Sequence, residues 1–358
     1  MTTHVMPQRA GGTRTGYAEL SARIRGAGLM ERRSGYYLAK FTLTWAAFGA
    51  GWAAFVLIGA TWWQLITAAV LGALSTQIAF LGHDVGHKQV AGSTRVRYLL
   101  GLLHGNLAVG LSIGWWLDKH NRHHAHPNHT DLDPDVAPAA FLIFFPEQGA
   151  GRRGVFGWAT RHQAMLFFPL LMLEGLNLHV SSVQALRSRA VRGRRLEALI
   201  LAVHMTAFVV APFLVLNAWQ AVAFLAVHQA VFGVYMGCSF APSHKGMPTL
   251  TPAAERDYLR RQVLTSRNVR GGRWVDLLLG GLNYQIEHHL FPSMPRPNLR
   301  RARPVVAAFC AERGIRYCET GLLASYRLVL GHLHGVAADT GRTPGSEVAP
   351  LAGAPLSG

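Results

Sequence analysis

Three short stretches of the sequence carry histidines at spacings typical of metal ligands. Residues three or four positions apart lie on the same face of a helix, so each stretch turns its imidazoles in one direction. Together they offer seven imidazoles and one amide, which is more than a single zinc site uses. The sequence therefore predicts two metal ions. The members are His83 and His87; His120, His123 and His124; and Gln285, His288 and His289.

The ligand types narrow the choice of metal. Neutral imidazole suits iron, copper, zinc and nickel. The three cysteines, Cys238, Cys310 and Cys318, show no CxxC or paired spacing, and repeated carboxylates of the ferritin type are missing from the sequence. One reaction that such a centre could perform is the breaking of an unactivated C–H bond. This reaction requires a strong oxidant, which a metal centre can supply and side chains cannot. An iron pair is therefore the favoured interpretation.

Composition indicates a membrane protein. Half of the 358 residues are hydrophobic and 15% are charged, and the mean hydropathy is +0.18, which is apolar for a soluble chain of this length. The net charge of +17 fits either nucleic acid or an anionic membrane leaflet. We favour the leaflet, and no nucleic-acid partner, because the basic residues stand beside apolar segments. The substrate expected at such a surface is an acyl chain.

Four apolar stretches are long enough to cross a bilayer as helices. They pair into two hairpins, and Trp62 and Trp63 stand at the first turn, where interfacial aromatics are favoured. Two further stretches, 98–116 and 164–180, contain glycines or polar residues. We interpret them as re-entrant or interfacial, because a single crossing by either would separate the histidine groups. The expected spans are 41–60, 62–82, 196–216 and 219–240, and the fold class is an all-α integral membrane protein with a histidine-rich cap.

Charge asymmetry predicts the orientation. No Lys or Arg occurs in 49–82 or 196–244, so both hairpin turns lack positive charge. By the positive-inside rule, the histidines and both termini lie on the cytoplasmic side of the inner membrane. The expected organisation is a basic, disordered or surface-lying arm (1–34), one membrane domain (35–334) and a disordered tail (335–358).

The order of the three groups and their flanking residues resemble the membrane fatty acid desaturases. The flanks are GHDVGH, WWLDKHNRHHAHPN followed by DPD, FAPSHKGMP, and NYQIEHHLFPSMPRPNLRRARP. They are similar to the bacterial acyl-CoA or acyl-lipid branch that is related to front-end desaturases with a QxxHH third group. The similarity extends over roughly residues 30 to 330, and three ordered groups are far more specific than one HxxHH.

This resemblance implies a di-iron desaturase that uses O2 and two electrons to leave a cis double bond in a long acyl chain. His244, in APSHKG, matches the additional ligand that the family supplies before its third group, although a helix-end role would also explain it. Gln285 takes a place that other branches give to histidine. The residues implied as iron ligands are His83, His87, His120, His123, His124, His244, Gln285, His288 and His289.

Other polar and aromatic residues near the groups have two interpretations each. Asp84, Asp133 and Asp135 would orient imidazoles by accepting their second N–H, or cap helices and pair with arginines. Trp115 and Trp116 would line the acyl tunnel or anchor the chain at the interface. His126 and His129 are expected to be solvated or to support the ligands, because the family pattern is complete without them.

The electrons are expected to come from a separate ferredoxin or flavin and iron–sulfur reductase, because the sequence contains no HPGG signature of a haem electron-donor domain. Arginines within 256–273 and 296–303 are candidate docking residues for an acidic carrier; alternatively they contact lipid phosphates or coenzyme A. Two other functions use similar residues. One is a membrane hydroxylase or carotenoid ketolase, and the other is a metal transporter, which needs polar ligands along a path through the membrane.

Overall fold

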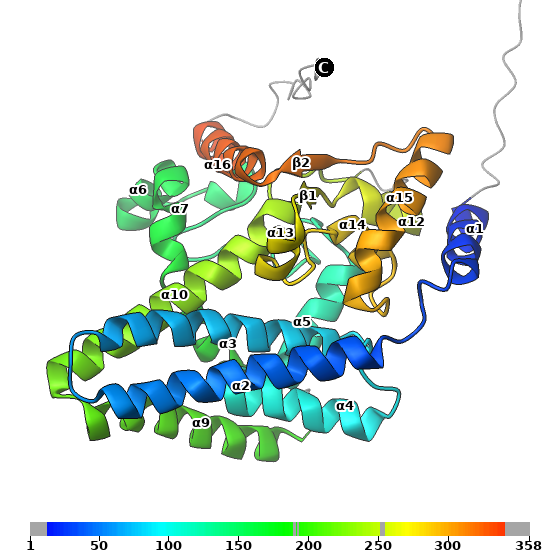
Figure 1. Ribbon diagram of the computed structural model, residues 1–358. Helices are drawn as coiled ribbons and strands as arrows, with labels where there is room; N and C mark the ends of the chain where they lie inside the picture. The colour runs from blue at the N-terminus through cyan, green and yellow to red at the C-terminus, as the bar shows by residue number, and fades with distance from the viewer. Residues whose placement is uncertain (1–12, 189–190, 192, 251–254, 341–358) are drawn as a thin grey trace, which may run out of the picture.

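The computed structural model describes residues 13–188, 191, 193–250 and 255–340, and within them the chain is mainly helical (Figure 1). The predicted arm and tail continue outside these residues, at 1–12 and 341–358. The elements are α1 (Thr13–Gly26), α2 (Ser34–Ile58), α3 (Gln64–Gly86), α4 (Thr94–Gly101), the π-helix η1 (Leu102–Val109), α5 (Ile113–Ala125), the 3₁₀ helix η2 (Pro146–Gly149), α6 (Gly154–Arg161), α7 (Gln163–Leu171), α8 (Glu174–Ala185), α9 (Arg194–Val215), α10 (Ala218–His244), α12 (Tyr258–Leu264), β1 (Asn268–Arg270), α13 (Arg273–Leu278), α14 (Gln285–Leu290), α15 (Arg296–Glu312), β2 (Glu319–Gly321) and α16 (Leu322–Asp339).

Four of the described helices, α2, α3, α9 and α10, are long and apolar enough to cross a membrane. They form the two hairpins expected from the sequence and lie together in the lower part of Figure 1. The first hairpin turns at Gly59, which has a φ of 70°. There the Gln64 side chain donates to the carbonyl oxygens of Phe55 and Gly59, at 2.6 and 2.9 Å. Trp62 and Trp63 are 59% and 70% exposed at this turn.

The two stretches interpreted as re-entrant are sharply bent helix pairs. The segment Thr94–Val109 meets α5 at 105°, and α7 meets α8 at 70°. At the first bend Gly110 has a φ of 75°, a left-handed backbone conformation that favours glycine. Because the two helices of each pair meet at such an angle, neither pair forms one straight span.

Shorter helices form a cap over one end of the long ones. A buried apolar core joins α1, α12, α14 and α15 through side chains such as Leu20, Ile24, Val263 and Phe309. Residues 13–26 are thus a packed helix, where the sequence predicted a disordered or surface-lying arm; Leu20 and Ile24 are four positions apart and bury one face of α1. In the same way, the start of the predicted tail belongs to α16, which continues to Asp339.

A short parallel ladder closes the cap. β1 pairs with β2, with Asn268 opposite Glu319 and Arg270 opposite Gly321. The ladder places the segment after α12 beside the segment before α16 (Figure 1). It thereby fixes Asn268 next to α14, which carries the third histidine group: the Asn268 side chain accepts a hydrogen bond from the Ile286 backbone at 2.9 Å.

Candidate metal centre and substrate cavity

The three histidine groups converge from separate elements. His83 is in the last turn of α3 and His87 caps that helix; the second group occupies α5, and the third is in α14. His244, the last residue of α10, joins them. All nine residues that the sequence singled out as ligands lie in this one cluster, and their role as ligands remains a prediction.

Nitrogen atoms of the cluster fall into two sets. In each set the candidate ligand atoms lie within 4.8 Å of one another and the residues are buried. His124 lies between the sets: its Nε2 is 3.1 Å from Nε2 of His120, and its ring stacks on His289 with centroids 4.2 Å apart. Two adjacent metal positions are therefore available. The sets are His83, His87, His120 and His288; and His123, His244 and His289.

Several polar atoms of the cluster are buried with no hydrogen-bond partner, which is the arrangement that a metal would satisfy. A buried nitrogen without a partner is costly, and five of the buried atoms without a partner belong to this one cluster. Gln285 contributes one of them, because its amide nitrogen contacts Nε2 of His244 at 2.8 Å and leaves its oxygen unpartnered. The donor set thus fits two metal ions. The unpartnered atoms are Nε2 of His83, His288 and His289, Nδ1 of His124 and Oε1 of Gln285.

The outward nitrogens of three imidazoles are held by hydrogen bonds. His289 Nδ1 donates to Gln262 Oε1 at 2.9 Å, and His244 Nδ1 donates to the Thr265 carbonyl oxygen at 3.1 Å. His123 Nδ1 donates to both carboxylate oxygens of Asp133 at 3.0 Å. Such contacts fix the ring orientation and tautomer and direct Nε2 inward. Asp133 thus has the contact that the sequence analysis suggested for it.

The other two aspartates bind cations as well as lying near imidazoles. Asp135 forms an ion pair with Lys119, and its second oxygen is 3.5 Å from His123 Nδ1. Asp84 is 3.6 Å from His83 Nδ1 and 2.7 Å from the Arg296 guanidinium. The two interpretations offered for these residues therefore coexist in one geometry.

Arg296 is a buried residue next to the cluster, where it pairs with Asp84. It is 7% exposed, and its guanidinium also donates to the Phe80 carbonyl oxygen at 2.8 Å. Its backbone N–H donates to Tyr37 Oη and Gln89 Oε1. Arg267 is likewise buried, and its guanidinium donates to the Pro242 and Lys245 carbonyl oxygens. The prediction that these two arginines belong to a docking surface is wrong, because both are needed to satisfy buried acceptors.

A buried glutamate from α9 fixes the bend that leads into α5. Glu197 is 0% exposed, and one of its oxygens accepts from Ser112 Oγ at 2.6 Å, Asn106 Nδ2 at 3.1 Å and the Gly114 backbone at 3.3 Å. Asn106 Oδ1 in turn accepts from the Ile113 backbone at 3.1 Å. The free N–H groups at the start of α5 are therefore paired, and the helix carrying three of the histidines begins at a fixed place.

Burial and mutual repulsion keep most of the imidazoles neutral. Burial, and then the neighbouring histidines, lower the pKa of His87, His120, His124, His288 and His289 well below its usual value. His123 is different: burial lowers its pKa, but the carboxylates of Asp135 and Asp133 outweigh burial, and the net shift is upward. Neutral imidazole is the form that binds a metal.

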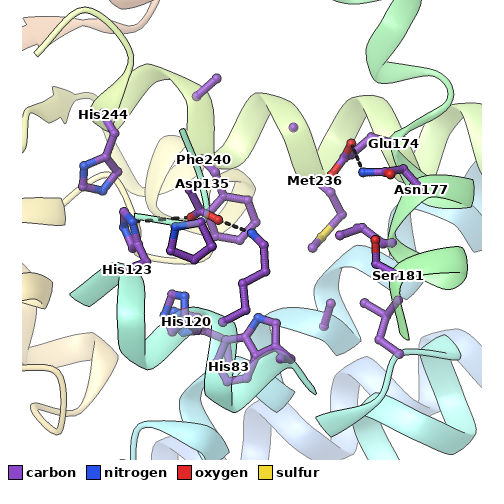
Figure 2. Close-up of a pocket in the computed structure, with 18 of the residues that line it drawn as sticks. His83, His120, His123, Asp135, Glu174, Asn177, Ser181, Met236, Phe240 and His244 are labelled. Carbon is purple, nitrogen blue, oxygen red and sulfur yellow. Dashed lines mark hydrogen bonds and ion pairs between the residues drawn. The ribbon is translucent and has the colours of Figure 1, made fainter. Parts of the chain in front are cut away.

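An apolar cavity of about 330 Å³ adjoins the cluster. Its wall includes His83, His120, His123 and His244 on one side and α8 on the other (Figure 2). Trp115 and Trp116 line it, as the tunnel interpretation suggested. The Trp116 ring stacks on His120 with centroids 4.5 Å apart, so this indole is part of both the cavity wall and the cluster. Apolar side chains that complete the lining include Val109, Leu111, Leu171, Met236 and Phe240.

The remaining histidines near the site have other contacts. His129 is 3.4 Å from Glu255, and its Nδ1 accepts from the Asp131 backbone. His104 accepts from the Trp45 indole at 3.0 Å, and His179 donates to the Gly110 carbonyl oxygen at 2.9 Å. His126 also lies outside both sets. That His126 and His129 are not ligands remains a prediction.

Sequence reasoning missed three buried charged residues, Glu197, Arg296 and Glu287. The side chain of Glu287, between the ligands of the third group, accepts from Asn268 Nδ2 at 2.8 Å and Tyr317 Oη at 2.6 Å. The sequence held a signal for Glu197, since an acidic residue at the start of an apolar span is unusual. For Arg296 and Glu287 the surrounding arginines and histidines hid any comparable signal.

Comparison with known proteins identifies the family. The model of the fatty acid desaturase family matches residues 60–321. The chain is 31% identical over 312 residues to an acyl-lipid (9-3)-desaturase of Physcomitrium patens, a match that covers 84% of this chain and 59% of the relative. It is 30% identical over 325 residues to a Delta(8)-fatty-acid desaturase of Helianthus annuus, covering 84% and 68%. This chain belongs to the fatty acid desaturase family.

A further relative is named for a different class of lipid. The chain is 30% identical over 342 residues to a Delta 8-(E)-sphingolipid desaturase of Kluyveromyces lactis, covering 90% of this chain and 59% of that relative. The chain thus spans between 59% and 68% of the lengths of these three relatives.

Proposed function

We propose that this protein is a membrane-bound oxidoreductase that introduces a cis double bond into a long acyl chain. The observation that carries this proposal is the position of the two imidazole sets, each of which contributes two histidines to one side of an apolar cavity. A saturated chain in that cavity would present its methylene groups to the metal centre. The family of the chain, whose named relatives act on acyl lipids, fatty acids and sphingolipids, supports the same activity.

Two iron ions fit this donor set. One would be held by His83, His87, His120 and His288, and the other by His123, His244 and His289. His124 and Gln285 would complete the set, because each has a buried atom with no partner. When bound, the iron pair would supply the oxidising power needed to remove hydrogen from an unactivated C–H bond.

The residues of the chain position the substrate and protect the reaction. Trp116 stacks on His120 and would hold the acyl chain against the cluster. The apolar wall would exclude water from the reacting carbons. Asp133, Gln262 and Thr265 keep three imidazoles in the tautomer with an inward Nε2, so the donor set is organised before the metal binds.

The proposed reaction balances with an external electron source. Two hydrogens leave neighbouring carbons as the double bond forms, and O2 takes them up with two further protons and two electrons to give two waters. The electrons would come from a separate ferredoxin or flavin and iron–sulfur reductase. Either acyl-CoA or acyl-lipid could carry the chain, and the basic residues that remain exposed near the cap would attract phosphate groups or an acidic carrier.

We further propose that the protein lies in the inner membrane with the cluster and both termini on the cytoplasmic side. Positive charge in the sequence supports this orientation, since neither hairpin turn carries Lys or Arg. Residues 35–334 would form the membrane domain that carries the activity. A reporter fused after Trp62, compared with one fused after Asp339, would test the orientation: the opposite labelling pattern would contradict it.

The decisive experiment is fatty-acid analysis of a desaturase-deficient host that expresses the chain. We expect a new unsaturated acyl chain, detected as its methyl ester by mass spectrometry. His123→Ala should abolish this product and lower the iron content of the purified protein, whereas His126→Ala, three positions along, should change neither. Hydroxylated product in place of an alkene would favour the hydroxylase, and a protein that binds no iron would contradict both.

A further inference from the structure

The side of the cavity opposite the histidines carries a polar face that the metal chemistry does not use. Glu174, Asn177 and Ser181 all line the cavity and all come from α8 (Figure 2). Their spacing of three and then four residues places them on one face of that helix. Elsewhere the lining on this side is apolar, with Leu178, Met236 and Phe240 as neighbours.

Close helix packing holds this face of α8 toward the cavity. The opposite side of α8 lies against α10, where a Cβ added to Gly175 would be 3.0 Å from the Gln229 carbonyl oxygen, and one added to Gly233 would be 2.7 Å from the Gly175 nitrogen. Backbone atoms this close allow α8 little rotation. The outer face carries exposed apolar residues such as Leu176, which is 50% exposed.

The hydrogen-bonding capacity of this face is mainly that of an acceptor. Asn177 Nδ2 donates to Glu174 Oε2 at 3.1 Å. This contact leaves the second carboxylate oxygen of Glu174, the Asn177 carbonyl oxygen and the Ser181 hydroxyl oxygen to accept from a ligand. Burial raises the pKa of Glu174 above its usual value, as expected for a carboxyl group partly removed from water.

The nearby cations are already paired elsewhere. Lys119 binds the Asp135 carboxylate. Lys245 donates to the Asp135 carbonyl oxygen at 2.6 Å, and its ammonium lies 3.7 Å from the centre of the Phe144 ring. Among the described residues, no ion pair joins a Lys or Arg to Glu174. Both lysines still act on Glu174 through space, and an N–H or O–H group of a ligand would find hydrogen-bond acceptors on this face.

We propose that Glu174, Asn177 and Ser181 form a subsite for an N–H or O–H group at the head of the acyl substrate. This inference rests on the proposed function, because it assumes that the cavity holds the acyl chain. The subsite would favour a head with a hydrogen-bond donor a few bonds from the acyl carbonyl. Two sources have that chemistry: the amide or hydroxyl groups of a sphingoid lipid, and the amide of a pantetheine thioester. A plain glycerolipid ester lacks it.

Binding of three stearoyl ligands to the purified metal-loaded protein would test the subsite. The ligands are an N-stearoyl sphingoid amide, stearoyl-CoA and a phosphatidylcholine with a stearoyl ester, and the readout is the dissociation constant in detergent micelles. Glu174→Ala and Ser181→Ala should each weaken binding of a donor-bearing ligand about tenfold, as expected for the loss of one hydrogen bond to the ligand. Binding of the ester should stay unchanged.

Leu176→Ala is the matched control, because this residue lies on the same helix and faces away from the cavity. It should bind all three ligands like the wild type. The wild type should prefer the amide or the thioester over the ester, and the Glu174 and Ser181 variants should lose this preference. That result supports the subsite, and the preferred ligand shows which of the two lipids carries the donor group. Equal weakening of all three ligands, or no weakening, overturns it. If no stearoyl ligand binds even to the wild type, the failure lies with the proposed function itself.

Discussion

The histidine cluster and the apolar cavity share a wall, yet different forces hold them in place. Around the cluster, buried charged and polar groups are paired: Glu197 at the start of α5, Arg296 with Asp84, and Glu287 with Asn268. Around the cavity, helices meet through glycines, as where Gly233 of α10 approaches the backbone of Leu171. One region is fixed by directional bonds and the other by close packing.

The two sharp bends show the same contrast. The bend before α5 is crossed by hydrogen bonds from Ser112, Asn106 and Gly114 to Glu197. The bend between α7 and α8 follows Pro169, which cannot donate a helix hydrogen bond, and it is held against α10 by the Gly175 and Gly233 contact. Metal ligands need defined directions, whereas a flexible acyl chain needs space of the right shape, so each region has the support that its task requires.

The largest expected effect comes from breaking the buried ion pair beneath the cluster. Arg296→Met leaves Asp84 as an uncompensated buried charge, so the free energy of unfolding should fall by about 4 kcal/mol. Denaturant titration of the purified protein in detergent measures it. The double variant Asp84→Asn with Arg296→Met should recover most of this loss. A stable Arg296→Met single variant would show that the pair does not support the cluster.

Removing the glutamate at the first bend should have the next largest effect. Glu197→Ala leaves three buried donors without an acceptor and should lower the free energy of unfolding by roughly 3 kcal/mol. The iron content should fall too, because α5 would lose its fixed start. Glu197→Gln keeps an acceptor at the same place and should retain more of both. If iron content stays at the wild-type level in Glu197→Ala, the bend does not set the positions of the α5 histidines.

Disturbing the packing around the cavity should cost less and should spare the metal centre. In Gly233→Ala the new Cβ would lie 2.4 Å from the Leu171 carbonyl oxygen, so α7 and α8 must move away from α10 at a cost of about 2 kcal/mol. Acyl ligand affinity should change while iron content does not. Gly49→Ala is the control, because a Cβ there meets nothing within 4 Å. Loss of iron in Gly233→Ala would mean that the two regions are mechanically coupled.

The smallest effect is a pH dependence at Glu287. Burial raises the pKa of this carboxyl to about 7, above its value in the unfolded chain. The folded protein then holds the proton more tightly than the unfolded chain, so stability falls as the pH rises toward about 7 and levels off above it, with about 1 kcal/mol of the fall between roughly pH 6 and pH 7. Glu287→Gln cannot titrate and should lack this part of the slope in thermal unfolding curves. Parallel curves for the two proteins would contradict the assignment.

Much of the site followed from local spacing. The spacings in 83–87, 120–124 and 285–289 identify groups of residues that share one helix face, and the lengths of the apolar stretches give the four long helices. Both signals depend on residues only a few positions apart. Helix α1 was not predicted, because its basic residues outnumber the two buried apolar residues that pack it against the cap, Leu20 and Ile24.

The sequence by itself determined the chemistry of this protein: which residues could bind metal, on which helix faces they lie, and that the chain belongs in a membrane. Only the tertiary structure decided which groups meet. The contacts of Gln285 with His244, of Arg296 with Asp84 and of Glu197 with Ser112 join residues that are 41 to 212 positions apart. The physical reason is that helix periodicity governs neighbours within one element, whereas contacts between elements depend on the direction in which each bend sends the chain.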